Sequence, residues 1–304
     1  PPAAPAPNGS APEEGGCELE GGAIERPRHF DVIGDVAVLS TAPEDEAERA
    51  VVAAAMLKQN GKVKIVAARC GGLQGDERAA GRLEILAGPQ RRPLMTTHAE
   101  FGVRYVIDLE GAFFSPRMGP ERQRLCGLVQ DCEDVCVLFA GCCPEVLQLA
   151  ANTNAQSVTA VELNPGAIAC GRRSLDLLAK RSPERAACVS LVEGDVREKA
   201  AELPLAHFHR VLAPRPKGKT QDEDDALVSE FLRCLLPLLR PEGCCHWYDF
   251  VADWEFPACE RSVARIAQAC EAVGLSCKVQ RCAPANNKPV AERQYRTVID
   301  FVVE

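Results

Sequence analysis

Short apolar runs alternate with amphipathic segments of helical spacing from Val135 to the end of the chain. The apolar runs predict buried strands and the amphipathic segments predict helices. Strands are expected at 135–141, 157–165, 188–196, 209–214, 244–251, 276–282 and 295–304, and helices at 144–153, 166–178, 227–239 and 261–273. This alternation is typical of an α/β fold with a doubly wound, mostly parallel sheet, here closed by an antiparallel hairpin.

The region before residue 114 has a different pattern. A strand with a tight bend at Gly34 and Asp35 is expected at 30–40, followed by a helix at 44–58 and strands at 63–69, 82–88 and 103–114. Residues 1–26 are rich in Pro, Ala, Gly and Glu, so burial cannot offset their ordering entropy. We therefore expect a disordered leader or linker at 1–28, a small α+β domain at 29–113 and a catalytic domain at 114–304.

The net charge of −8 does not by itself favour a nucleic-acid partner. Residues 1–26 hold five glutamates and one arginine, a net charge of −4, and 222–225 form a second acidic block. Basic clusters at 91–92, 122–124, 172–173 and 217–219 leave RNA binding open, because salt confines each charge to about 8–10 Å.

The sixteen cysteines mostly lie among apolar residues and predict buried free thiols in a reducing compartment, and their spacing matches no familiar zinc site. No metal is expected. No apolar run approaches the roughly 18–20 residues that span a bilayer, so no membrane partner is expected either. The chain begins at Pro1 and is expected to be a processed or excised piece.

Three strand ends carry the strongest chemical signal. They are Phe139-Ala140-Gly141, Glu162 and Gly194-Asp195, each at the carboxyl end of a successive predicted strand. Ligands of open α/β sheets bind at this edge, where an acid can accept hydrogen bonds from ribose hydroxyls and another from an adenine amino group. NAD is the rival cofactor, but the single glycine does not match G-x-G-x-x-G. A nucleoside cofactor without a pyrophosphate is therefore predicted.

Six strings in order resemble the tRNA guanine N1-methyltransferases, which act on the guanine just 3′ of the anticodon. The strings are FSPRMGPER (114–122), FAGCCPE (139–145), VELNPGA (161–167), EGDVRE (193–198), HRVLAPRPKG (209–218) and HWYDF (246–250). The resemblance spans 29–304 and implies a Rossmann-like class I methyltransferase domain behind a small RNA-side domain. It also implies S-adenosylmethionine as cofactor and tRNA as partner.

The resemblance also implies roles for individual residues. The cofactor contacts would be Phe139, Ala140, Gly141, Glu162, Leu163, Asn164, Asp195 and Val196. The catalytic candidates would be Arg104, Arg117, Glu145 and Pro214, with an arginine stabilising charge on the guanine O6 and Glu145 taking the N1 proton. His246 is expected to be a core histidine, and Tyr248 to pack beneath the cofactor pocket. We expect a monomer in the cytoplasm, with mitochondrial or nuclear locations also open.

Some positions depart from the family pattern. Cys143 replaces a second glycine, and Pro214-Arg215-Pro216 replaces a turn that reads N-LP or P-LP, with the acids of 222–225 close behind it on an expected RNA path. Two alternatives to methylation therefore stay open. One is the aminocarboxypropyl transfer performed by wybutosine-pathway relatives, and the other is a catalytically inactive RNA-binding relative.

Overall fold

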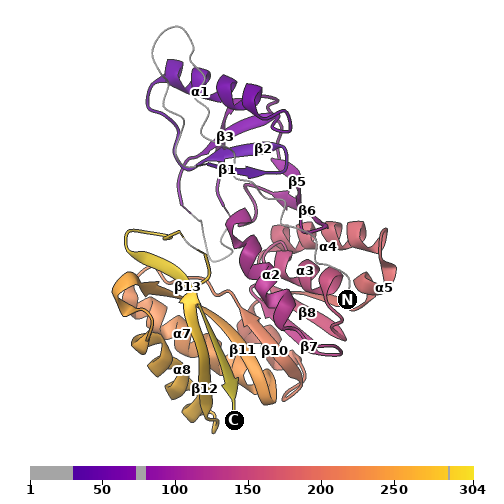
Figure 1. Cartoon of the computed structure of the whole chain (residues 1–304), viewed down its shortest axis with the longest axis vertical. Helices are drawn as coiled ribbons and strands as arrows, with labels where there is room; N and C mark the ends of the chain where they lie inside the picture. Colours follow the sequence, from indigo (N-terminus) through magenta and orange to yellow (C-terminus); the bar gives the residue numbers. More distant parts are fainter. Residues whose placement is uncertain (1–29, 73–79, 287) are drawn as a thin grey trace, which may run out of the picture.

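The computed structural model describes residues 30–72, 80–286 and 288–304, so the expected leader at 1–28 lies outside the described residues. A small unit lies above a larger α/β unit in Figure 1. The small unit holds a four-stranded sheet in the order β1-β2-β3-β4, covered by helix α1 (Glu46–Gln59). Its strands are β1 (Phe30–Ile33), β2 (Val36–Leu39), β3 (Ile65–Arg69) and β4 (Leu83–Ala87).

The bend predicted at Gly34 is a hairpin turn between β1 and β2. Gly34 has a φ of +60°, and a Cβ there would lie 2.1 Å from Thr96 Oγ1, so only glycine fits. Two hydrogen bonds hold this turn against the hairpin of β5 (Met95–Glu100) and β6 (Val103–Asp108): Gly34 N donates to His98 and Asp35 N donates to Thr96.

The strand predicted at 103–114 begins at Val103 as expected, but its end was wrong. It stops at Asp108, and residues 95–100 form its partner β5, which sequence analysis missed. The hairpin packs on the larger unit, because Val106 N donates to Ser174 Oγ on α4 (Pro165–Ala179) at 2.8 Å. This packing favours a domain boundary earlier than residue 114. The position of the boundary stays a prediction.

The larger unit is built on a seven-stranded sheet in the order β12-β13-β11-β10-β7-β8-β9. All neighbours from β11 to β9 are parallel, and β13 runs antiparallel between β11 and β12. The doubly wound α/β prediction and the closing hairpin are therefore confirmed. The strands are β7 (Asp134–Leu138), β8 (Ser157–Glu162), β9 (Val189–Glu193), β10 (Phe208–Ala213), β11 (Leu239–Ala252), β12 (Cys277–Pro284) and β13 (Gln294–Val303).

Helices cover both faces of this sheet, and strand β7 shows how the two cores are filled. Its alternate residues Val135 and Val137 enter one core, whereas Cys136 and Leu138 enter the other. The helices on the first face are α2 (Gly119–Leu128), α3 (Pro144–Asn152), α4 and α5 (Pro183–Ala187); those on the second are α6 (Val196–Lys199), α7 (Gln221–Leu235) and α8 (Glu260–Ala272). In the described part of the chain, four short 3₁₀ segments complete the elements: η1 (Pro116–Met118), η2 (Ala200–Glu202), η3 (Leu236–Leu238) and η4 (Asp253–Glu255).

The expectation of buried free thiols is confirmed for part of the described cysteines, whereas Cys70 and Cys132 are exposed. Cys136, Cys142, Cys143 and Cys245 are buried and free, and burial raises the pKa of each thiol. Cys259 and Cys282, however, form a disulfide between the start of α8 and strand β12. Sequence spacing could not show this pair, because the two residues meet only through the packing of α8 on the sheet.

Candidate cofactor and substrate site

The carboxyl ends of β7, β8 and β9 are joined by hydrogen bonds. Gly141 N donates to Glu162 Oε2 at 2.6 Å, and Ala140 N donates to the carbonyl of Val161 at 3.0 Å. On the other side, Gly194 N donates to the carbonyl of Glu162 at 2.8 Å. The structure thus brings Gly141, Glu162 and the Gly194-Asp195 turn together at one edge of the sheet.

The loop that follows β7 turns sharply through three left-handed residues. Phe139, Gly141 and Cys143 have φ values of +57°, +57° and +64°. A Cβ at Gly141 would meet nothing closer than the Phe113 carbonyl at 3.8 Å, so this backbone is open to a close ligand. Ala140 is buried beneath it, and Phe139 packs edge-on against Phe231 of α7.

Cys143 occupies the position where the family pattern has glycine. Its left-handed backbone costs roughly 1–2 kcal/mol for a residue with a Cβ. The thiol is fully buried against α4, where a Cβ on Gly171 would lie 2.6 Å from Cys143 Sγ. The absence of a Cβ at Gly171 therefore leaves room for the side chain of Cys143.

Glu162 is only 8% exposed, and each of its carboxylate oxygens accepts one backbone N–H. Oε1 accepts from Asn164 N at 2.7 Å, and Oε2 accepts from Gly141. A carboxylate oxygen can accept a second hydrogen bond, so the group is oriented and still suited to ribose hydroxyls. Its chemistry therefore fits a nucleoside cofactor.

Asn164 and Leu163 follow directly after β8. The Asn164 Oδ1 caps α4 by accepting from Gly166 N and Ala167 N, and its Nδ2 donates to the Gly111 carbonyl at 2.7 Å. These bonds give the Asn164 side chain a structural role, while Leu163 is half-buried beside it. The predicted cofactor role of both residues stays a prediction.

Asp195 caps α6, where its Oδ1 accepts from Arg197 N at 2.8 Å, and Val196 is buried behind it. The Arg197 guanidinium forms an ion pair with the same carboxylate. This hydrogen-bonded partner lowers the pKa of Asp195. A bound adenine would have to share this carboxylate with Arg197.

The four predicted catalytic residues lie on four different parts of the fold. Arg104 is exposed on β6, and Pro214 is half-buried directly after β10. Arg117 is ion-paired with Asp31 of β1 at 2.8 Å, which ties η1 to the small unit. Glu145, in the first turn of α3, lies 3.2 Å from the guanidinium of Arg122.

Arg122 is the centre of a buried ion-pair network that connects the β5–β6 hairpin to the larger unit. Its side chain is 2% exposed and also binds Glu100 at 2.8 Å and the Ser115 carbonyl at 3.0 Å. Burial alone would lower the pKa of Arg122, but Glu145 and Glu100 raise it. Glu145 therefore has a structural task besides its predicted role as a proton acceptor.

Arg215 does not line the substrate side of the turn after β10, because its side chain is fully buried. The guanidinium is ion-paired with Asp224 at 2.7 Å and with Asp249, and it lies 5.6 Å from the ring centre of Trp247. Burial would lower the pKa of Arg215, but Asp249 and Asp224 raise it. The departure from the leucine of the family pattern is thus balanced by two acids.

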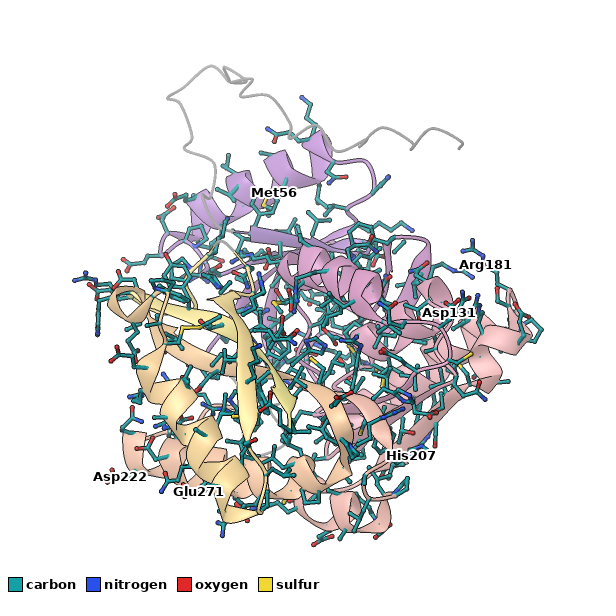
Figure 2. The ribbon with its side chains drawn as sticks, turned by 60° about the horizontal axis from the view of Figure 1, so that its bottom comes forward. Met56, Asp131, Arg181, His207, Asp222 and Glu271 are labelled. Carbon is teal, nitrogen blue, oxygen red and sulfur yellow. A yellow bond between two sulfur atoms is a disulfide. The ribbon has the colours of Figure 1, made fainter. Side chains whose placement is uncertain are left out.

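The expectation that 222–225 place four negative charges on an RNA path was wrong for Asp224, whereas Asp225 is exposed. Asp224 is buried against Arg215, and Asp225 is ion-paired with Arg265. All four belong to the first turns of α7, which begins at Gln221 rather than 227, where acids are favoured by the helix dipole. Asp222 is at the periphery of the molecule beside α8 in Figure 2.

A chain of buried polar contacts runs behind the substrate edge, and sequence analysis missed most of it. Tyr248 Oη donates to Glu121 at 2.6 Å, Glu121 binds Arg124, and Arg124 binds Asp300 at 2.7 Å. Asp300 in turn contacts His246 Nδ1 at 2.6 Å. The contacts join residues from α2, β11 and β13 that are up to 176 positions apart, which no local pattern can show.

His246 is a buried core histidine, as predicted. Its Nε2 lies 3.2 Å from Arg210 NH1 and therefore accepts a hydrogen bond, because a guanidinium can only donate. Its Nδ1–H then donates to Asp300. Tyr248 is buried as well, and burial and Glu121 raise the pKa of its hydroxyl.

The sheet order, the joined strand ends and the left-handed loop define a Rossmann-like α/β fold whose strand ends suit a nucleoside cofactor. Among the described residues, no group of His, Cys, Asp and Glu could hold a metal ion. In the same part of the chain, no helix combines the length and the apolar character that a membrane span needs.

The chain belongs to the TRM5/TYW2 methyltransferase family. The model of the TRM5/TYW2 methyltransferase domain matches residues 96–279, and the model of the TYW2 N-terminal domain matches residues 19–91. The family binds S-adenosylmethionine and modifies tRNA, so the predicted family and cofactor are confirmed.

Individual relatives are distant but cover most of the chain. The tRNA (guanine(37)-N(1))-methyltransferase Trm5b of Pyrococcus abyssi is 27% identical over 91% of this chain and 75% of its own length. Its crystal structure matches with a TM-score of 0.74 and 26% identity over 91% of this chain and 76% of that one. The structure of P. horikoshii TYW2 in complex with MeSAdo has the same fold, with a TM-score of 0.69 and 22% identity over 91% of each chain.

Proposed function

We propose that this chain methylates N1 of the guanine just 3′ of the anticodon in tRNA, with S-adenosylmethionine as the methyl donor. The observation that carries the proposal is the 27% identity with Trm5b over 91% of the chain, which includes every element of the site. The turn after β10 supports it. Pro214 and Pro216 keep the P-x-P outline of the methylating type, and Arg215 between them is directed into the core.

In this mechanism the cofactor supplies an electrophilic methyl group on its sulfonium. Glu162 would hold the ribose, Asp195 the adenine amino group, and the open backbone at Gly141 would border the cofactor. The protein must hold guanine N1 in line with the methyl group and remove its proton. The predicted proton acceptor is Glu145, and the basic candidates for the guanine O6 are Arg104 and Arg117.

Transfer of the aminocarboxypropyl group is the second candidate. The match of residues 19–91 to the TYW2 N-terminal domain favours it, since the structure of P. horikoshii TYW2 is a complex with MeSAdo, the nucleoside that aminocarboxypropyl transfer leaves. The two reactions break different bonds of the same sulfonium. Methyl transfer leaves S-adenosylhomocysteine, whereas aminocarboxypropyl transfer leaves 5′-methylthioadenosine.

Both products can be measured in one experiment. The protein is incubated with S-adenosylmethionine and either a tRNA transcript that carries guanine 3′ of the anticodon or a tRNA that carries the modified base of the wybutosine pathway there. Nucleosides are then analysed by mass spectrometry. We expect 1-methylguanosine and S-adenosylhomocysteine, and neither with a transcript that carries adenine at that position. An aminocarboxypropyl nucleoside with 5′-methylthioadenosine would overturn methylation. An absence of both, with no thermal shift on adding cofactor, would indicate the inactive relative.

A further inference from the structure

Strand β11 extends well past its neighbour at the edge where the cofactor loop lies. Ala213, the last residue of β10, pairs with Trp247, but β11 continues to Ala252 and then into η4. At about 3.3 Å per residue, the end of β11 overhangs β10 by roughly 17 Å. Because carboxyl ends of parallel strands share one edge, η4 stands on the substrate side of the sheet. The start of strand β13 pairs with this end of β11, and in Figure 1 it lies at the end of the larger unit that is nearer the small unit.

Trp254 on η4 is 70% exposed and is held in place by a cation. The Arg293 guanidinium lies 5.4 Å from the centre of the Trp254 ring, and its Nε is 3.1 Å from the carboxylate of Asp253. The other acid of η4, Glu255, accepts a hydrogen bond from Ala252 N. An oriented indole with its remaining surface in solvent is suited to stacking on a planar group.

Basic residues are frequent in the stretch that contains Arg293 and pairs with the end of β11. The stretch 281–296 holds Arg281, Lys288, Arg293 and Arg296 and a single acid, Glu292. On the facing turn, Lys217 Nζ donates to Gln294 at 2.6 Å and lies 5.6 Å from the ring centre of Phe250. Cations interleaved with aromatic rings suit the phosphates and bases of single-stranded RNA.

We propose that Trp254 and Arg293 form a stacking platform for an unstacked base of the RNA substrate, next to the base that is modified. The proposal rests on the proposed function for the identity of the RNA. A target base that enters an active site leaves its stack, which costs a few kcal/mol and deprives its neighbour of a stacking partner. An indole at the substrate edge replaces that partner.

The two tryptophans of the chain allow a direct test, because they differ in environment. Trp247 is fully buried, so quenching by RNA reports on Trp254. An anticodon stem-loop RNA that carries the target guanine and a fluorescent label is titrated with each protein. The anisotropy of the label gives the Kd of every variant, and the tryptophan emission of the wild type is followed separately. We expect quenching of tryptophan emission in the wild type, and a Kd for Trp254→Ala that is about fivefold to a hundredfold higher, which is the loss of one base–aromatic stack. Trp254→Tyr should recover most of the affinity.

The matched control is Leu205→Ala. Leu205 is similarly exposed, at 66%, but it precedes β10 and therefore lies at the opposite edge of the sheet. Its Kd should equal that of the wild type. Melting temperatures of all variants are measured to show that each is folded.

The outcomes separate this proposal from the proposed reaction. If Trp254→Ala weakens RNA binding but no group is transferred to tRNA, the stacking platform is supported and the proposed reaction is overturned. If transfer occurs while Trp254→Ala binds RNA as the wild type does and RNA leaves the emission unchanged, the platform is overturned and the reaction stands.

Discussion

The carboxylate of Glu162 accepts the backbone N–H of Gly141 at 2.6 Å, and this hydrogen bond joins the ends of β7 and β8. It orients a buried negative charge beside a backbone that a ligand can approach. The same carboxylate therefore stabilises the loop and is the predicted ribose ligand. A substitution that keeps its shape and removes its charge should mainly affect cofactor binding.

Replacement of Glu162 by Gln should weaken S-adenosylmethionine binding by about tenfold or more. The reason is that hydrogen bonds to a charged group contribute about 1.5–3 kcal/mol each. Isothermal titration calorimetry measures the Kd. Glu193→Gln is the control, because Glu193 pairs with Glu162 in register on β9 but is exposed and bound to Arg172. Equal affinities for the two variants would remove Glu162 from the cofactor site.

Arg215→Leu restores the leucine of the family pattern and should nevertheless destabilise this chain. It leaves Asp224 and Asp249 buried without their main cation, and breaking such a buried pair costs about 3–5 kcal/mol. Urea unfolding should show a lower midpoint. Arg233→Leu, on the exposed face of α7, is the control and should change the midpoint little. A midpoint for Arg215→Leu equal to that of the wild type would contradict a stabilising network.

The joined strand ends could be predicted from sequence because they depend on which residues directly follow each apolar run. Each apolar run ends in a small or acidic residue, and parallel strands bring those ends to one edge. The partners of Arg215 could not be predicted, since Asp249 is 34 residues away and is reached only after β11 lies beside β10. Strand β5 was missed for another reason: its sequence MTTHAE is mostly polar, because it pairs only with β6.

Gly171→Ala should destabilise the chain even though alanine favours helices. The added Cβ would lie 2.6 Å from Cys143 Sγ, and overpacking of this kind costs about 1–3 kcal/mol. Gly127→Ala in α2 is the control, because nothing lies within 4 Å of its Cβ position, and it should stabilise by up to about 1 kcal/mol. In a double-mutant cycle, Cys143→Gly should recover much of the loss from Gly171→Ala. Independent effects of the two substitutions would show that the residues do not share this space.

Asp300→Asn should flatten the loss of stability at acidic pH. Burial alone would raise the pKa of Asp300, but hydrogen bonds from His246 and Arg124 lower it below the ordinary 3.8. A carboxyl group whose pKa is lower in the folded state stabilises the fold above its unfolded pKa, and this stabilisation is lost as the pH falls through the folded value. The free energy of unfolding of the wild type should therefore fall below pH about 4 more steeply than that of Asp300→Asn. Urea unfolding across that range measures both slopes, and Asp222→Asn, which removes an exposed carboxylate, should keep the wild-type slope. Parallel slopes for Asp300→Asn and the wild type would show that this buried carboxylate does not contribute to acid unfolding.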